Sequence, residues 1–105
     1  MDTLPQPRKI LHSHIFEHER SAATTDAPAA RRHLLATDIL TACDPRWWVT
    51  GDLDALDPKE VGELICSSLT QFIAHTGGDP ELTAWLGRVR DDITSAGFHT
   101  RHSAA

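Results

Sequence analysis

Two stretches in the second half of the chain carry apolar residues at helical spacing. Residues 58–76 place an apolar side chain every three or four positions, and residues 80–96 repeat the pattern. This spacing lines up apolar side chains on one face of an amphipathic helix. The two stripes consist of Val61, Leu64, Ile65, Leu69, Phe72 and Ile73, and of Leu82, Trp85, Leu86, Val89 and Ile93. We therefore predict a helix over each stretch.

Both predicted helices have clear start signals. Asp57 suits an N-cap, Pro58 suits the first helical position, and Glu60 can complete a capping box. The Asp-Pro pair recurs at residues 79–80. Because only the short TGGD segment (76–79) separates the two helices, we expect them to pack as an antiparallel hairpin.

A further helix is predicted over residues 28–43. Pro28 suits its first turn, and the pair at residues 44–45 ends it, because the residue before a proline disfavours helical geometry. Its predicted buried face consists of Leu35, Ile39 and Cys43, with Leu34 and Ala42 beside them.

The N-terminal segment is ambiguous, because residues 8–20 fit helical spacing and also strand alternation. We favour a short helix. The predicted fold is all-α: a small bundle of three main helices (28–43, 58–76 and 80–96) with a short N-terminal helix or an extended arm. The predicted organisation is a flexible or partly helical N-terminal arm, a helical bundle and a disordered tail, over residues 1–27, 28–98 and 99–105.

The composition is that of a small globular protein, with 105 residues, 40% of them hydrophobic and 24% charged. No apolar run approaches the ~20 residues that a membrane span requires, and no signal peptide is recognisable, so we expect a cytoplasmic protein with no membrane contact. The bias towards Arg, Ala and Thr is typical of a bacterial, GC-rich genome. Because the bundle is small, we expect self-association along a helix face to supplement its core.

The charge distribution argues against nucleic-acid binding. The formal net charge is −5, and residues 34–105 carry eleven acids against five Lys and Arg. The segment LDPKEVGELI (56–65) resembles the opening helix of excisionase-type and MerR-type regulators. Such regulators need a basic recognition helix, yet no Lys or Arg occurs between Glu60 and Gly87. One alternative stays open, a DNA-associated regulator that binds phosphates through Arg8, Lys9, Arg20, Arg31 and Arg32.

Three histidines crowd the N-terminal segment, at His12, His14 and His18. On a helix, His14 and His18 share a face as a zinc-binding pair does. Further ligands would have to come from distant residues, such as His33, His99 or Cys43. A metal-binding protein or an accessory subunit of an enzyme is therefore a second alternative.

The remaining reactive residues show no recognised catalytic motif. Cys43 and Cys66 are predicted to be buried, reduced thiols with a structural role. The aspartates of residues 52–57 do not fit a calcium loop, because Leu56 stands where an oxygen ligand is needed. We predict no catalytic residue, no metal ligand and no cofactor, and we expect a non-enzymatic protein.

The segment PRWWVTGDLD (45–54) is the strongest candidate for a binding surface. It sets two adjacent tryptophans before two aspartates at the corner between two predicted helices. We expect at least one ring to anchor the core. The other ring is either buried with it across the helix junction or partly exposed, and an exposed aromatic ring surrounded by charge often forms a binding hot spot. We therefore predict a protein–protein interaction module that binds another protein or a second copy of itself as a homodimer. Its predicted partner-binding residues are Trp47, Trp48, Asp52 and Asp54.

Overall fold

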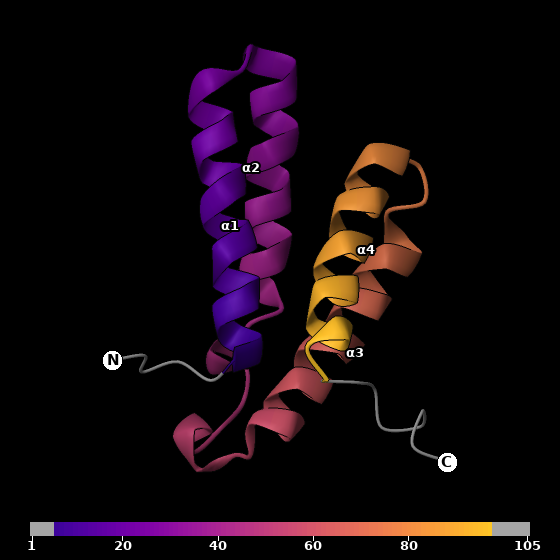
Figure 1. Cartoon of the computed structure of the whole chain (residues 1–105). Helices are drawn as coiled ribbons and strands as arrows, with labels where there is room; N and C mark the ends of the chain where they lie inside the picture. Colours follow the sequence, from indigo (N-terminus) through magenta and orange to yellow (C-terminus); the bar gives the residue numbers. More distant parts are fainter. Residues whose placement is uncertain (1–5, 98–105) are drawn as a thin grey trace.

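Two helical hairpins pack against each other (Figure 1). The computed structural model describes residues 6–97. The hairpins are formed by α1 (Gln6–Thr24) with α2 (Ala27–Ala42), and by α3 (Pro58–His75) with α4 (Pro80–Ser95). No strand occurs in residues 6–97. The predicted all-α class is therefore confirmed, whereas the prediction of three main helices is one short.

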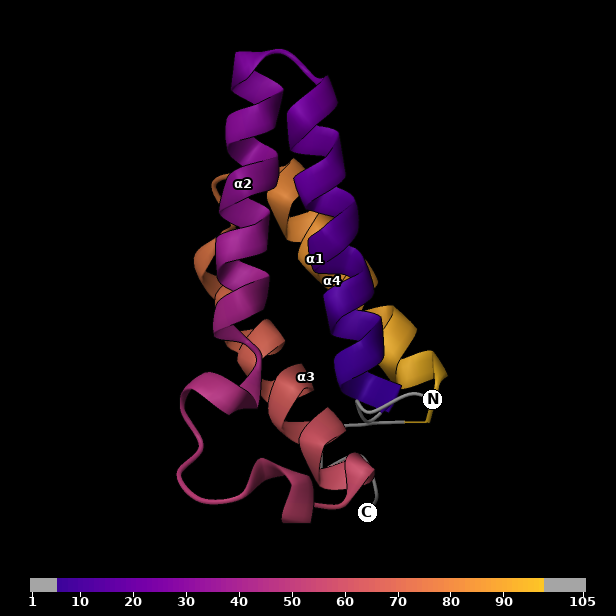
Figure 2. The same ribbon diagram turned by 90° about the vertical axis from the view of Figure 1, so that its left-hand side faces the viewer.

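The two hairpins form two layers joined at one end of the molecule (Figure 2). Between α2 and α3 the chain makes two short 3₁₀ helices, η1 (Pro45–Trp47) and η2 (Leu53–Ala55). This connection lies near the N-terminal end of α1, and the tight turn between α1 and α2 lies at the opposite end (Figures 1 and 2). The connection is thus positioned to contact the base of both layers.

The helix starts follow the predicted capping signals. The Asp57 carboxylate accepts a hydrogen bond from the Lys59 backbone N–H at 3.0 Å, and Asp79 accepts one from the Leu82 N–H at 3.2 Å. Asp26 occupies the N-cap position of α2, but its side chain makes no capping hydrogen bond. The bounds of α2, α3 and α4 agree with the sequence prediction to within one residue.

Helix α1 is a main element of the bundle and not the short N-terminal helix that we expected. It spans 19 residues, and Leu11 on it is fully buried in the common core. The apolar stripe of α1 is hard to recognise because Arg8, His12 and His14 interrupt it. All three side chains pair with carboxylates of other segments. This pairing offsets the free-energy cost of placing polar groups at helix contacts.

The core runs through all four helices, with most of its volume between α3 and α4. Leu34 and Leu35, which we predicted on the buried side of α2, are 52% and 46% exposed. The buried residues of α2 are instead Ala36, Thr37 and Leu40. Cys43 is buried as predicted. The buried residues of the core are Leu11, Leu40, Cys43, Val61, Ile65, Cys66, Leu69, Leu86, Val89 and Ile93.

Candidate functional site

The tryptophan pair lies at the corner between α2 and α3, and both rings face solvent. Trp47 is 69% exposed and Trp48 is 46% exposed. Our expectation that at least one ring anchors the core is therefore wrong. The apolar contacts of this connection with the core come from other residues, because Pro45 is fully buried and Leu53 and Leu56 pack partly against the core.

A buried carboxylate fixes the start of the turn that carries the two tryptophans. Arg8 donates from Nε to Oδ1 of Asp44 at 3.1 Å and from Nη2 to Oδ2 at 3.2 Å. The Arg46 backbone N–H also donates to Oδ1 at 3.1 Å, and His12 Nε2 lies 2.7 Å from Oδ2. Only 2% of Asp44 and 3% of Arg8 are exposed. The turn is thus tied to the first turns of α1 across a sequence separation of 36 residues.

The electrostatics of this cluster keep Asp44 charged. Burial by itself raises the pKa of Asp44, but the hydrogen bonds from His12, the Arg46 N–H and Arg8 outweigh burial and bring the pKa below its ordinary value. Removing one partner of such a buried pair leaves the other charge uncompensated, which typically costs about 3–5 kcal/mol. The cluster therefore holds the base of the turn firmly in one position.

The backbone of the turn is closed by its own hydrogen bonds. The Trp47 N–H donates to the Asp44 carbonyl at 3.2 Å, and the Val49 N–H donates to the Pro45 carbonyl at 2.8 Å. Gly51 then reverses the chain direction with a φ of +97°, a conformation that favours glycine. The two exposed rings thus stand on a backbone whose geometry is fixed before any partner arrives.

The predicted acidic neighbours lie in the same connection. Asp52 is exposed, and its backbone carbonyl accepts a hydrogen bond from the Ala55 N–H at 3.1 Å, which begins η2. Asp54 belongs to η2, and its side chain lies outside the described part of the chain. The role of both aspartates in partner binding stays a prediction.

The clustered histidines do not converge on one site. Each has a different partner: His12 with Asp44 at 2.7 Å, His14 with Asp92 at 2.6 Å, and His18 with His33 at 2.9 Å. Across residues 6–97, no group of three or more His, Cys, Asp or Glu side chains is placed to hold a metal ion. His99, another ligand that we considered, lies outside the described residues.

Trp85 forms a second cluster, which the sequence analysis missed. We expected it in the apolar core, but it is only partly buried and stacks on His33, with ring centroids 4.4 Å apart and an interplanar angle of 11°. The His18 ring lies 4.9 Å from the Trp85 ring. The sequence did contain a signal of this cluster. His18 stands in the interrupted apolar stripe of α1, and a polar side chain buried at such a position is expected to have a hydrogen-bond partner.

Some basic residues of the DNA-binding alternative already form ion pairs with acidic side chains of the protein. Arg8 is buried against Asp44, and Arg32 donates to Asp79 at 3.0 Å and to Glu81 at 2.9 Å. Two of the five positive charges are therefore already neutralised within the protein. This arrangement leaves less charge for phosphate contacts.

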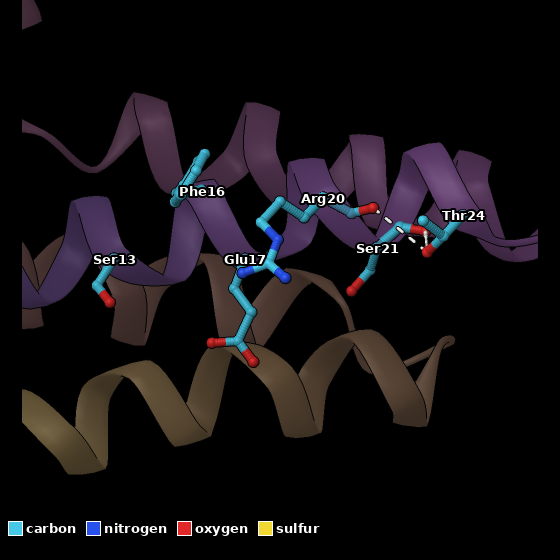
Figure 3. A pocket seen from close by; sticks show the side chains of 6 residues that line it. All are labelled: Ser13, Phe16, Glu17, Arg20, Ser21 and Thr24. Carbon is cyan, nitrogen blue, oxygen red and sulfur yellow. Dashed lines mark hydrogen bonds between the residues drawn. The ribbon is translucent and has the colours of Figure 1, made fainter.

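A shallow hollow of about 370 Å³ lies on the surface of α1 (Figure 3). Its lining residues all belong to that one helix, so the hollow has no opposing wall. Phe16 is 62% exposed and points away from α4, whereas Glu17 projects towards α4 (Figure 3). The Thr24 hydroxyl lies within hydrogen-bonding distance of the Arg20 and Ser21 carbonyls, at 3.4 and 3.3 Å. Such an open surface does not enclose a substrate.

Both cysteines are buried thiols. Burial raises the pKa of Cys43 to about 12, and burial likewise raises the pKa of Cys66. Because the thiolate is the nucleophilic form, neither thiol is activated for catalysis at neutral pH.

Comparisons with protein-family models, with curated proteins and with solved structures give no match to this chain. Among the helices of residues 6–97, none combines the length and apolar character that crossing a membrane demands. The function must therefore be argued from the site itself.

Proposed function

We propose that this protein is a non-enzymatic interaction module that binds other proteins through its tryptophan turn, which we define as residues 44–51. The observation that carries the proposal is the exposure of Trp47 and Trp48 on a turn whose base, Asp44 and Pro45, is buried. A large ring left in water beside a well-packed core gains free energy when a partner covers it. The tryptophan turn is the contact surface in this proposal.

The residue types of the turn support a binding role. Arg46 is exposed next to Trp47 and Trp48, and Trp and Arg are enriched among the residues that dominate protein–protein binding energies. Because the hydrogen bonds of Asp44 and those between backbone groups of the turn hold its backbone, little conformational entropy is lost on binding. The expected partner surface is an apolar pocket with an acidic group facing Arg46.

A second copy of this chain is one partner included in the proposal. The net charge of −5 reflects an excess of acidic side chains, so the exposed Arg46 of one copy can find complementary charge on another. Size-exclusion chromatography with light scattering, from low to high micromolar concentration, measures this self-association. The buried thiols of the two cysteines are consistent with the cytoplasmic location that we also propose.

The partner surface is tested by comparing three variants in pull-downs and in light scattering. Trp47→Ala and Trp48→Ala should each lose the bound partner or the dimer, because the ring supplies most of the buried apolar area. Phe16→Ala is the matched control, since Phe16 is equally an exposed aromatic side chain but lies on α1. A monomeric protein whose recovered partners are the same in all three variants would refute the proposal.

A further inference from the structure

Two histidines and a tryptophan from three helices meet where the two hairpins face each other. His18 of α1 and His33 of α2 bring their Nδ1 atoms to 2.9 Å. Both rings contact Trp85 of α4, with His33 stacked at 4.4 Å and His18 tilted at 4.9 Å. This contact therefore joins the first hairpin to the second, and it does so independently of the tryptophan turn.

The Nδ1 contact limits how many protons the pair can carry. A neutral imidazole has one N–H donor and one acceptor nitrogen, so one ring donates from Nδ1 and the other accepts at Nδ1. One added proton is compatible with this bond, and a charged ring against the Trp85 face gains a cation–π attraction. When both rings are protonated, two N–H groups face each other at 2.9 Å and two positive charges repel.

The surrounding charges oppose protonation of His18. Burial is the largest influence that lowers the pKa of His18, and the positive charges of His33, His14 and Arg88 lower it further. Glu17 acts in the opposite direction but does not compensate, so the pKa of His18 lies below its ordinary value. Helices α1, α2 and α4 thus all contribute groups that favour the neutral form of His18.

The other two histidine contacts of α1 are with carboxylates and not with a second imidazole. His12 faces the Asp44 carboxylate at 2.7 Å, and His14 faces the Asp92 carboxylate at 2.6 Å. Protonation turns each of these into an ion pair and strengthens it. Two protonated rings at His18 and His33 repel each other, whereas a protonated ring at His12 or His14 faces a carboxylate.

We propose that His18, His33 and Trp85 form a proton-operated latch between the two hairpins, closed at neutral pH and opened when both imidazoles are protonated. A small cavity of about 260 Å³ beside the rings, lined in part by Glu17 and Arg88, lets water reach them. Opening separates the middle of α1 and α2 from the first turns of α4 and moves the Trp85 ring into water. The buried core residues and the contacts of His12 and His14 with their carboxylates stay in place.

The test uses a chain in which Trp85 is the single tryptophan, made by Trp47→Phe and Trp48→Phe at exposed positions. Acrylamide quenching of Trp85 is measured between pH 7.5 and pH 5, with far-UV circular dichroism to follow helix content. The latch predicts at least a twofold rise in the quenching constant on acidification, with helix content unchanged. His18→Gln and His33→Gln each remove one titrating ring but keep a neutral hydrogen-bonding group, so the rise should disappear in both.

Equal quenching at both pH values, or the same rise in the Gln variants, would overturn the latch. NMR titration of the imidazole C–H signals in the chain with both histidines gives a check that needs no histidine substitution. The latch predicts that His18 and His33 titrate in a coupled manner. The second proton should bind to the pair only over the pH range in which the Trp85 signals also shift. Two independent titration curves with no change at Trp85 would contradict it.

Discussion

Arg8 and Asp44 form a two-bond ion pair that links the first turns of α1 to the start of the tryptophan turn. Their two N···O distances are 3.1 and 3.2 Å, and both side chains are almost completely buried. The pair therefore has two effects at once. It holds α1 in the bundle, and it sets the position from which Trp47 and Trp48 project.

Asp44→Ala should destabilise the protein by about 3–5 kcal/mol, because it leaves the Arg8 guanidinium buried without a counter-charge. Urea denaturation measures the change in the free energy of unfolding. Asp38→Ala is the matched control, since Asp38 is exposed on α2 and should change stability by less than about 0.5 kcal/mol. Arg8→Met combined with Asp44→Leu should restore part of the loss, and an additive double variant would show that the pair is not coupled.

Trp47→Ala and Trp48→Ala should each change the free energy of unfolding by less than about 0.5 kcal/mol, because both rings are exposed. Partner affinity should fall by about tenfold or more, as expected for a hot-spot tryptophan. Trp85→Ala is the contrasting variant, because it removes ring contacts between helices and should cost about 2 kcal/mol of stability. A large stability loss in the first two variants would show that the rings pack against the protein.

The helix bounds could be predicted wherever a single residue pair carries the signal. Asp57–Pro58 and Asp79–Pro80 combine an N-cap with a residue suited to the first helical turn, so α3 and α4 are predicted to within one residue. Helix α1 has no such local mark. Its polar residues Arg8 and His14 become acceptable at helix contacts only through Asp44 and Asp92, which are distant in sequence.

The site was predictable in position but not in orientation. The location of the tryptophan pair at a helix corner follows from Asp44–Pro45, which ends α2. Which apolar residues of the corner reach the core depends on the path of the chain through Gly51, and no local pattern encodes that path. Leu53 and Leu56 pack against the core, where we expected a tryptophan.

Gly51→Ala should destabilise the protein by about 1 kcal/mol or more and should weaken partner binding, because a φ of +97° strains any residue with a Cβ atom. The strain lies in the backbone alone, since no atom lies within 4 Å of the added methyl group. Gly77→Ala is the matched control, because Gly77 is as open but has no positive φ. Equal effects of the two substitutions on unfolding would exclude a special role for the Gly51 turn.

Cys43 and Cys66 should resist alkylation in the folded protein, because both thiols are buried and burial raises their pKa values. Iodoacetamide labelling at pH 8 followed by mass spectrometry should find little modification in native buffer and two labels in urea. Rapid labelling of the native protein would show that one of the thiols reaches solvent, and the site of the label would identify it.

Stability should fall in two stages as the pH decreases. The pKa of His18 lies below its ordinary value of 6.5, so the unfolded chain binds more protons and stability is lost as the pH falls below about 6.5. The pKa of Asp44 is also lowered, so its contribution is fully present above pH 3.8 and is lost as the pH falls through the pKa of the folded state. Urea denaturation from pH 8 to pH 3 measures both stages, and His18→Gln should reduce only the first. An unchanged first stage in that variant would assign the loss to another group.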